Sequence, residues 1–231
     1  MKFVRALKEW RFRIFYRLLL HTRSDLVTLG EPAGGCSWTV CSSLLGPQSI
    51  VYCGGVGNDV SFERALVNQF GCEVVLCDPS PTGEQTMQRP ENKLRQFHFR
   101  PLALTAHRGM LRLARPLNET GDWWLSSNGN KNGSLELPCT DLASLMAERG
   151  HAHIDLLKLD IEGSEYAVLD DLLAHRLPVR QICVEYHHGI LPGIARSKTI
   201  SSILRLLTRG YKLVDQNIAN HTFVRKRSKL V

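Results

Sequence analysis

An apolar segment that ends in a glycine-rich turn and continues as a helix most constrains how this chain can fold. Residues 49–53 favour a β-strand, Gly54–Gly57 interrupts it, and Val60–Phe70 places apolar side chains at helical spacing. A second apolar strand, Cys72–Cys77, follows and ends at Asp78. Strand, turn and helix in this order predict a parallel α/β sheet. Such a turn brings the backbone close to a ligand and aims the helix N-terminus at it.

The carboxylate that ends the second strand indicates a nucleoside ligand. Asp78 lies 21 residues after Gly57, and an acid at this spacing can accept both hydroxyls of an adenosine ribose. The alternative is that Asp78 caps a turn or helix before Pro79. The nicotinamide fingerprint fails, because its sixth position, counted from Gly55, is Val60, where a small residue is needed. A nucleoside cofactor without a pyrophosphate therefore remains open.

Two later apolar strands, at 154–159 and 181–185, carry titratable side chains at their carboxyl ends. These side chains are Lys158, Asp160 and Glu162 for the first strand, and Glu185, His187 and His188 for the second. Charges in a central strand are costly to bury unless they are paired or used in function. A purely structural Lys158–Asp160 ion pair is the alternative for the first strand.

The remaining patterns complete the element order. Residues 98–104 are a third candidate strand, and Thr140 is a plausible N-cap of a helix over 141–149. Residues 118–134, with Trp123 and Trp124, predict a long loop, whose tryptophans either stack on a substrate or pack beneath the loop. Two further strands, at 211–216 and 221–225, are expected to form a terminal antiparallel pair.

Composition favours an ordinary globular protein of one large domain. The 231 residues are 43% hydrophobic and 22% charged, and no apolar run approaches the ~18 residues that span a bilayer. The seven cysteines form no CxxC pair, which favours reduced thiols in a cytoplasmic protein. The net charge of +7 resides at the two ends, and residues 24–224 are mildly acidic. A nucleic-acid enzyme usually carries its positive charge around the active cleft, so no nucleic-acid partner is expected.

The ends differ from the body. Residues 1–27 predict an amphipathic basic helix, 28–225 the main domain and 226–231 a basic tail. One apolar stripe of the helix comprises Phe3, Leu7, Trp10, Ile14 and Leu18. We expect this stripe to dock on the domain or on a second subunit of a homodimer. The alternative is contact of residues 2–20 with an anionic membrane surface, which would make the protein peripheral to the membrane.

Four segments resemble the FkbM family of S-adenosylmethionine-dependent methyltransferases: 52–63, 75–79, 154–165 and 183–187. The K-x-D-x-E-G-x-E segment at 158–165 is the most distinctive of them. The resemblance implies a seven-stranded Rossmann-like sheet of order 3-2-1-4-5-7-6, with the last strand antiparallel and helices on both faces. Gly54–Gly57 and Asp160–Glu162 would then share one cleft at the topological switch point.

The resemblance also implies roles for the site residues. The cofactor-binding residues would be Gly54, Gly55, Gly57, Asp59 at the methionine amino end, Asp78 at the ribose, and Glu162. The catalytic residues would be His187, Asp160, Lys158 and Glu185. One departure concerns Cys53, which stands where the general methyltransferase pattern has an acid two residues before the first glycine of its GxG motif. Ser61 and Glu63 would cap and orient the helix after the turn.

For a hydroxyl nucleophile, His187 is the first candidate for the general base because its ordinary pKa lies near neutral pH. Asp160 is the second candidate, with Lys158 to orient it. A divalent ion on Asp160, Glu185 and His187 is a third route, but mixed oxygen and nitrogen ligation is not ideal for Mg²⁺, and no metal is predicted.

The expected reaction is O-methylation of a hydroxyl on a sugar or small natural product, a substrate class that follows from the resemblance alone. The alternatives are a noncatalytic scaffold that binds the cofactor, an RNA-modifying methyltransferase and a nicotinamide oxidoreductase.

Overall fold

The computed structural model describes residues 14–32, 36–114, 124–125, 134–188, 191, 193–217 and 219–225. Part of the predicted N-terminal stripe (Phe3, Leu7 and Trp10), most of the 118–134 loop and the basic tail lie outside these residues. None of the helices within the described ranges has the length and hydropathy to cross a membrane.

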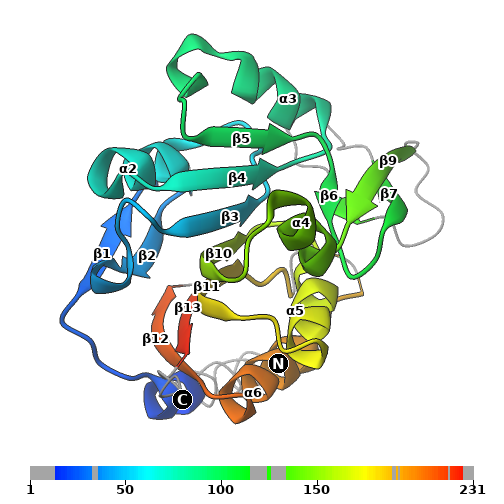
Figure 1. Ribbon diagram of the computed structural model, residues 1–231. Coiled ribbons are helices and arrows are strands. Elements are labelled where there is room, and N and C mark those ends of the chain that lie inside the picture. The colour runs from blue at the N-terminus through cyan, green and yellow to red at the C-terminus, as the bar shows by residue number, and fades with distance from the viewer. Residues whose placement is uncertain are drawn as a thin grey trace.

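A seven-stranded sheet forms the centre of the molecule (Figure 1). From one edge to the other, its strands are β5 (Phe97–Arg100), β4 (Glu73–Cys77), β3 (Ile50–Gly54), β10 (Ile154–Leu159), β11 (Val179–Glu185), β13 (Asn220–Arg225) and β12 (Tyr211–Asn217). The first five strands are parallel, and β13 runs antiparallel to both of its neighbours. Numbered along the chain, this order is 3-2-1-4-5-7-6, as the family resemblance implies.

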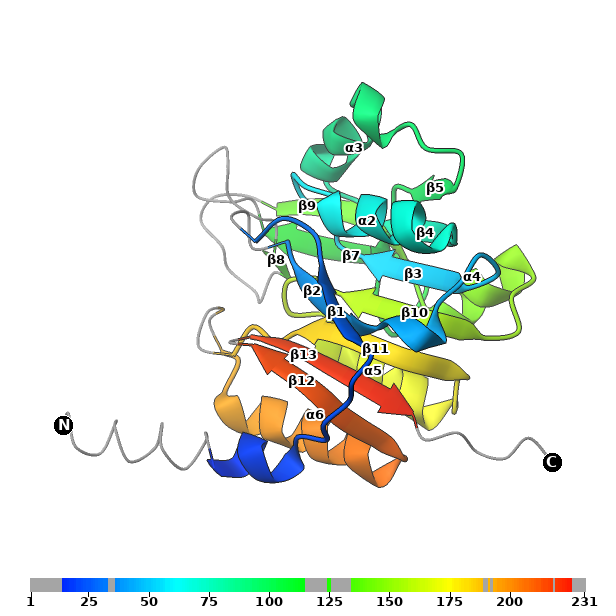
Figure 2. The ribbon, with the colours of Figure 1, turned by 90° about the vertical axis from the view of Figure 1, so that its left-hand side faces the viewer.

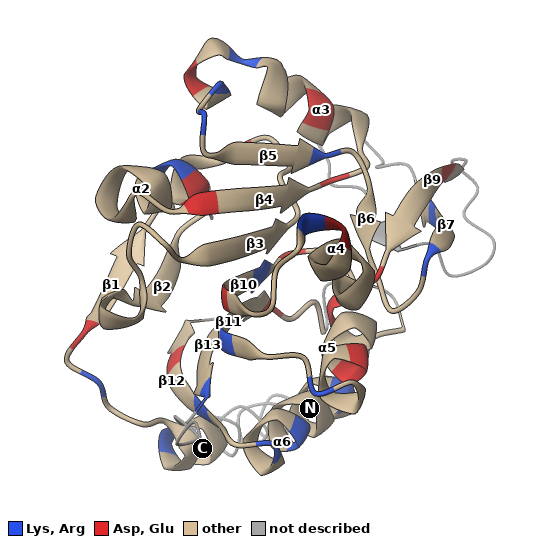
Figure 3. Ribbon diagram, viewed as in Figure 1, with Lys and Arg blue, Asp and Glu red and all other residues tan. Residues whose placement is uncertain are grey.

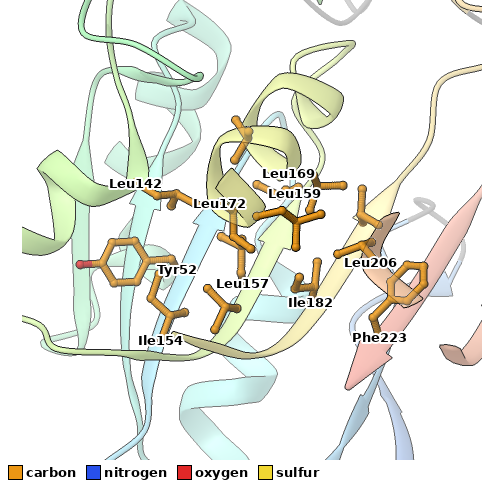
Figure 4. Close-up of a cluster of buried hydrophobic side chains, with 14 of the residues drawn as sticks. Tyr52, Leu142, Ile154, Leu157, Leu159, Leu169, Leu172, Ile182, Leu206 and Phe223 are labelled. Atoms are coloured by element: carbon orange, nitrogen blue, oxygen red, sulfur yellow. The ribbon is translucent and has the colours of Figure 1, made fainter. Parts of the chain in front are cut away.

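Helices cover both faces of the sheet, as predicted. They are α2 (Ser61–Phe70), α3 (Pro81–Gln88), α4 (Leu142–Arg149), α5 (Glu165–Ala174) and α6 (Arg196–Thr208). Helices α4, α5 and α6 share one hydrophobic cluster with the sheet, and α2 shares a second cluster with the opposite face. Figure 4 shows the first cluster, in which Leu157 and Leu159 of β10 point toward Leu169 and Leu172 of α5. Burial of all six β10 residues explains why this segment is almost continuously apolar.

Two smaller sheets flank the central one. A hairpin of β1 (Leu26–Leu29) and β2 (Trp38–Cys41) packs on the face that α2 covers. A four-stranded sheet lies beyond the carboxyl ends of β3 and β4 (Figure 1). Its strands are β6 (Ala103–Leu104), β9 (Ser134–Thr140), β7 (Gly109–Ala114) and β8 (Trp124–Leu125).

Local details depart from the sequence prediction at two positions. The predicted strand at 98–104 is divided at Pro101, and its two parts, β5 and β6, belong to different sheets. The N-cap of α4 is Asp141 rather than Thr140, because the Asp141 carboxylate accepts the N–H of Ser144 at 2.7 Å. An Asp side chain is one of the strongest N-caps, so the helix begins at Leu142, one residue later than predicted.

The N-terminal helix docks on the domain with a different side from the predicted stripe. Residues 14–19 are helical and lie beside α6 (Figure 2). Ile14 and Leu18, which belong to the predicted stripe, are 37% and 80% exposed, whereas Tyr16 is buried. The Tyr16 hydroxyl lies 2.7 Å from Nε2 of His221, and Phe15 and Leu19 pack against the core beside it.

Candidate functional site

A cavity of about 430 Å³ lies at the carboxyl ends of β3, β4, β10 and β11. It is lined by the glycine turn and by charged residues at 158–162 and 185–187. The first of these charged segments follows the turn by about 100 residues in the sequence, and the second lies further on. This is the shared cleft that the strand order requires at its switch point. The predicted residues that line it are Gly55, Gly57, Asp59, Asp78, Lys158, Asp160, Glu162, Glu185 and His187. Gly54 instead packs against Ile161 and Leu104 beneath the turn.

The glycine turn is built for close approach. Gly55 has φ +86°, and a Cβ at this position would lie 1.8 Å from the carbonyl oxygen of Asp160. Gly57 has φ +54°, and its Cβ would meet nothing within 4 Å. Glycine adopts such angles at no steric cost. The turn is therefore pressed against β10 at Gly55 and open toward the cavity at Gly57.

Asp78 holds this turn in place. Its Oδ2 accepts the N–H groups of Val56 at 2.8 Å and Gly57 at 2.9 Å, and its Oδ1 accepts the N–H of Ser80 at 2.8 Å. A carboxylate offers about four acceptor positions, so these contacts leave about one for a ligand. The alternative that Asp78 stabilises a turn is thus observed. Asp78 also lines the cavity, and its contact with the ribose hydroxyls stays a prediction.

Lys158 ties the turn to β10. Its buried Nζ donates to the carbonyl oxygen of Gly55 at 2.8 Å and lies 3.6 Å from Oδ2 of Asp160. The ammonium also lies 5.4 Å from the ring centroid of Trp38. Burial by itself would lower the pKa of Lys158, but the nearby carboxylates of Asp160 and Glu63 outweigh burial and raise it. Lys158 is therefore a permanent cation beneath the turn.

His187 is enclosed by carboxylates. Its Nδ1 lies 3.3 Å from Oε1 of Glu165, and its Nε2 lies 3.3 Å from Glu162 and 3.8 Å from Asp160. Burial would lower the pKa of His187, but Glu162 and Glu165 raise it to about 11. The imidazole is therefore protonated at neutral pH. The choice of His187 as general base depended on an ordinary imidazole pKa, and this premise is wrong in the folded protein. The neighbouring His188 contacts Thr199 at 2.9 Å.

Glu185 has the pKa that sequence reasoning assigned to His187. Burial and the negative charges of Asp160 and Glu162 raise the pKa of Glu185 to about 7, although the positive charge of His187 opposes the shift. A carboxylate with a pKa near neutral is suited to accept a proton during catalysis. The charged strand ends therefore contain a proton acceptor, at Glu185, and a fixed cation, at His187.

Three of these side chains are of types that bind divalent metal ions. One donor atom each from Asp160, Glu185 and His187 lies within 4.8 Å of the others. Nε2 of His187, which would have to bind the ion, carries a proton toward Glu162 when the imidazole is charged. An ion that binds Nε2 would have to displace that proton, and the absence of a metal stays a prediction.

Sequence reasoning missed three parts of the site. Glu165 belongs to the K-x-D-x-E-G-x-E segment, but the sequence analysis assigns it no role. In the structure its carboxylate contacts Nδ1 of His187. Leu111 and Leu113 of β7 form an apolar wall of the cavity. The only sequence signal for this role is that the two leucines alternate with other residues at the spacing of a β-strand. Trp38 lies over Lys158 from the β1–β2 hairpin, and nothing near it in the sequence connects it to the turn.

Two curated proteins are similar in sequence to this chain. Probable methyltransferase-like protein 24 of Homo sapiens is 26% identical over 208 residues, which cover 85% of this chain and 50% of the human protein. Its namesake in Rattus norvegicus is 30% identical over 162 residues, which cover 68% of this chain and 38% of the rat protein. The chain thus spans half or less of the length of these curated relatives.

Two solved structures overlap with the fold. Methanococcus jannaschii fibrillarin, a pre-rRNA processing protein, superposes with a TM-score of 0.43 at 10% identity, over 80% of this chain and 69% of that one. M. jannaschii TYW2, solved in complex with AdoMet, gives a TM-score of 0.39 at 12% identity, over 90% of both chains. Both TM-scores are below 0.5, so the assignment depends on the sequence match. The profile of the methyltransferase FkbM domain matches residues 52–213, well over half of the chain. The chain therefore belongs to the FkbM methyltransferase family, whose cofactor is S-adenosylmethionine, as the sequence motifs predicted.

Proposed function

We propose that this domain methylates a hydroxyl group of a sugar or another small natural product, with S-adenosylmethionine as the methyl donor. The observation that carries the proposal is that one cavity contains both the open glycine turn and the proton acceptor Glu185. In this proposal the cofactor binds beside the glycine turn, and the methyl acceptor binds beside the carboxylates at the ends of β10 and β11. The family supports methyl transfer, and the two ends of the cavity support a hydroxyl acceptor.

The cavity residues fit the cofactor. A volume of about 430 Å³ lies within the range of small-molecule sites, about 300–1,000 Å³. The open position at Gly57 allows the cofactor to lie against the backbone, and the remaining acceptor position of Asp78 suits one ribose hydroxyl. Gly57 and Asp78 are adjacent through the hydrogen bond between them, so both would contact the same ligand.

The charged residues at the ends of β10 and β11 have separate roles in the proposed reaction. When bound, S-adenosylmethionine supplies an electrophilic methyl carbon on a positively charged sulfur. Glu185 would accept the proton of the acceptor hydroxyl and so make its oxygen nucleophilic. His187 stays protonated and keeps the pKa of Glu185 from rising further. Lys158 holds both Asp160 and the glycine turn, and so aligns the two halves of the cavity.

The charge of the cavity favours an uncharged or cationic acceptor. Its lining carboxylates outnumber its cations, which are Lys158 and His187; the carboxylates are Asp59, Glu63, Asp78, Asp160, Glu162 and Glu185. An anionic acceptor would be repelled at short range. In the view of Figure 3, Lys and Arg positions lie among Asp and Glu positions along the described elements. This charge distribution supports a small acceptor over RNA, and Leu111 and Leu113 provide an apolar wall for its body.

Calorimetric titration of S-adenosylhomocysteine, the cofactor product, tests the proposal. We expect micromolar binding by the unmodified chain and loss of binding in Asp78→Ala, because the substitution releases the N–H groups of Val56 and Gly57. Asp170→Ala, at an exposed position of α5, is the control and should bind like the unmodified chain. The release of the same product from S-adenosylmethionine in a small-molecule extract then tests transfer. If the unmodified chain does not bind this nucleoside, the proposed function is wrong.

A further inference from the structure

Glu63 is a buried carboxylate whose hydrogen bonding the fold leaves incomplete. It lies in the first turn of α2, the helix that follows the glycine turn, and it is 2% exposed. Its Oε1 accepts no hydrogen bond from the described residues. Buried polar groups are nearly always satisfied in folded proteins, and an exception calls for an explanation. A ligand that brings hydrogen-bond donors would provide one.

The neighbours of Glu63 do not neutralise it closely. Nζ of Lys158 is the nearest cation, at 3.8 Å from Oε1, beyond hydrogen-bond distance. That ammonium is already committed to the carbonyl oxygen of Gly55 and shared with Asp160. The other contact is with the thiol of Cys53, a weak donor. Burial raises the pKa of Glu63, although the positive charge of Lys158 opposes the shift.

The position of Glu63 explains an anomaly in the sequence. Cys53, at the end of β3, stands where the general methyltransferase pattern has an acid, and its thiol contacts the Glu63 carboxylate. The carboxylate absent from the strand is thus provided by the helix. Glu63 also lines the cavity beside Gly57, Asp59 and Phe62.

Asp59, which the sequence analysis assigned to the methionine amino end, is used differently in the structure. Its Oδ1 accepts the N–H of Ser61, the first residue of α2. That oxygen is therefore less available to a ligand. Glu63, four residues after Asp59, has a buried oxygen that accepts no hydrogen bond from the described residues.

We infer that Glu63 binds the α-ammonium group of the amino-acid end of S-adenosylmethionine, as a positioning residue for the methyl donor. The inference rests on the proposed function. An ammonium group brings three donors and one positive charge, which are the two things that the buried carboxylate lacks. Anchoring the amino-acid end fixes the sulfur relative to Glu185 across the cavity.

A pair of ligands separates this role from a structural one. S-adenosylhomocysteine carries the ammonium, whereas 5′-methylthioadenosine has the same adenosine and sulfur without the amino-acid end. By calorimetry, Glu63→Gln should weaken the first ligand at least tenfold and change the second less than twofold. Glu84→Gln, the same substitution in the exposed first turn of α3, is the matched control and should change neither.

Each outcome decides the question. Equal losses for both ligands would show that Glu63 only shapes the turn, and no loss for either would show that the ammonium lies elsewhere; both results overturn the inference. If Glu63→Gln unfolds, as a thermal melt without ligand would show, Glu63→Asp keeps the charge but withdraws it by one methylene. The same selective loss is then expected, and its absence overturns the inference. Failure of the unmodified chain to bind either nucleoside would instead refute the proposed function.

Discussion

Two buried histidines on neighbouring parts of the sheet have opposite protonation states. His187 follows β11 and is enclosed by Glu162, Glu165 and Asp160, which raise its pKa to about 11. His221 lies on β13, where burial lowers its pKa to about 4. Its Nδ1–H donates to the carbonyl oxygen of Ala219, and its Nε2 accepts the hydroxyl of Tyr16, both at 2.7 Å.

The comparison shows how one residue type serves two purposes. Around His221 the partners are neutral and aromatic, and the ring is a satisfied part of the core that docks the N-terminal helix. Around His187 the carboxylates exceed the cations, and burial together with this electrostatic imbalance raises the pKa of Glu185. Functional sites are where such imbalance is expected, because perturbed pKa values serve catalysis.

The largest effect is expected at the proton acceptor on the His187 side. Glu185→Gln should lower the rate of methyl transfer by about 10²–10⁴-fold, the usual contribution of a general base, and leave binding of S-adenosylhomocysteine unchanged. Release of that product in a small-molecule extract measures the rate. Glu91→Gln, at an exposed position, is the control. Transfer at the unmodified rate in Glu185→Gln would place the base elsewhere.

On the other side of the comparison, His221 should make folding sensitive to acid. Its folded pKa lies below its unfolded value, so its stabilising contribution is complete above pH 6.5 and is lost as the pH falls toward 4. Between pH 7 and 5 the expected loss in the free energy of unfolding is about 2 kcal/mol, at about 1.4 kcal/mol per pH unit. Urea denaturation measures it, and His221→Gln should remove this component. An equal loss in the variant would contradict the assignment.

A subtler effect should follow from removing the fixed cation. The positive charge of His187 lowers the pKa of Glu185, so His187→Gln should raise that pKa further. The unmodified enzyme should gain activity as the pH rises through about 7, because Glu185 must be ionised to accept a proton. The midpoint of this profile should lie at higher pH in His187→Gln. A midpoint that does not move, or that moves to lower pH, would separate His187 from Glu185.

The smallest expected effect is that of metal removal. In the proposed mechanism Glu185 accepts the proton without a divalent ion, so EDTA should change neither nucleoside binding nor transfer. Addition of Mn²⁺ afterwards should also leave both unchanged. Activity that is lost on chelation and restored by a metal would instead make Asp160, Glu185 and His187 its ligands.

The architecture was largely predictable because its signals are local or carried by motifs. The glycine turn and the terminal strand pair follow from residue patterns, and the strand order from the family resemblance. The electrostatics of the site were not predictable, because they depend on distances between distant segments. Nothing in the sequence around His187 shows that Glu162 and Glu165 approach both of its ring nitrogens. Likewise, the face of residues 14–19 that docks is the one whose side chains find tertiary partners, such as Tyr16 with His221, and not the most regular apolar stripe.

A crystal structure of the chain with S-adenosylhomocysteine tests the central claim most directly. We predict that the adenosine contacts Asp78 and the glycine turn and that the sulfur faces Glu185 and Asp160 across the cavity. Electron density for the nucleoside outside this cavity, or a sulfur directed away from those two carboxylates, would contradict the account.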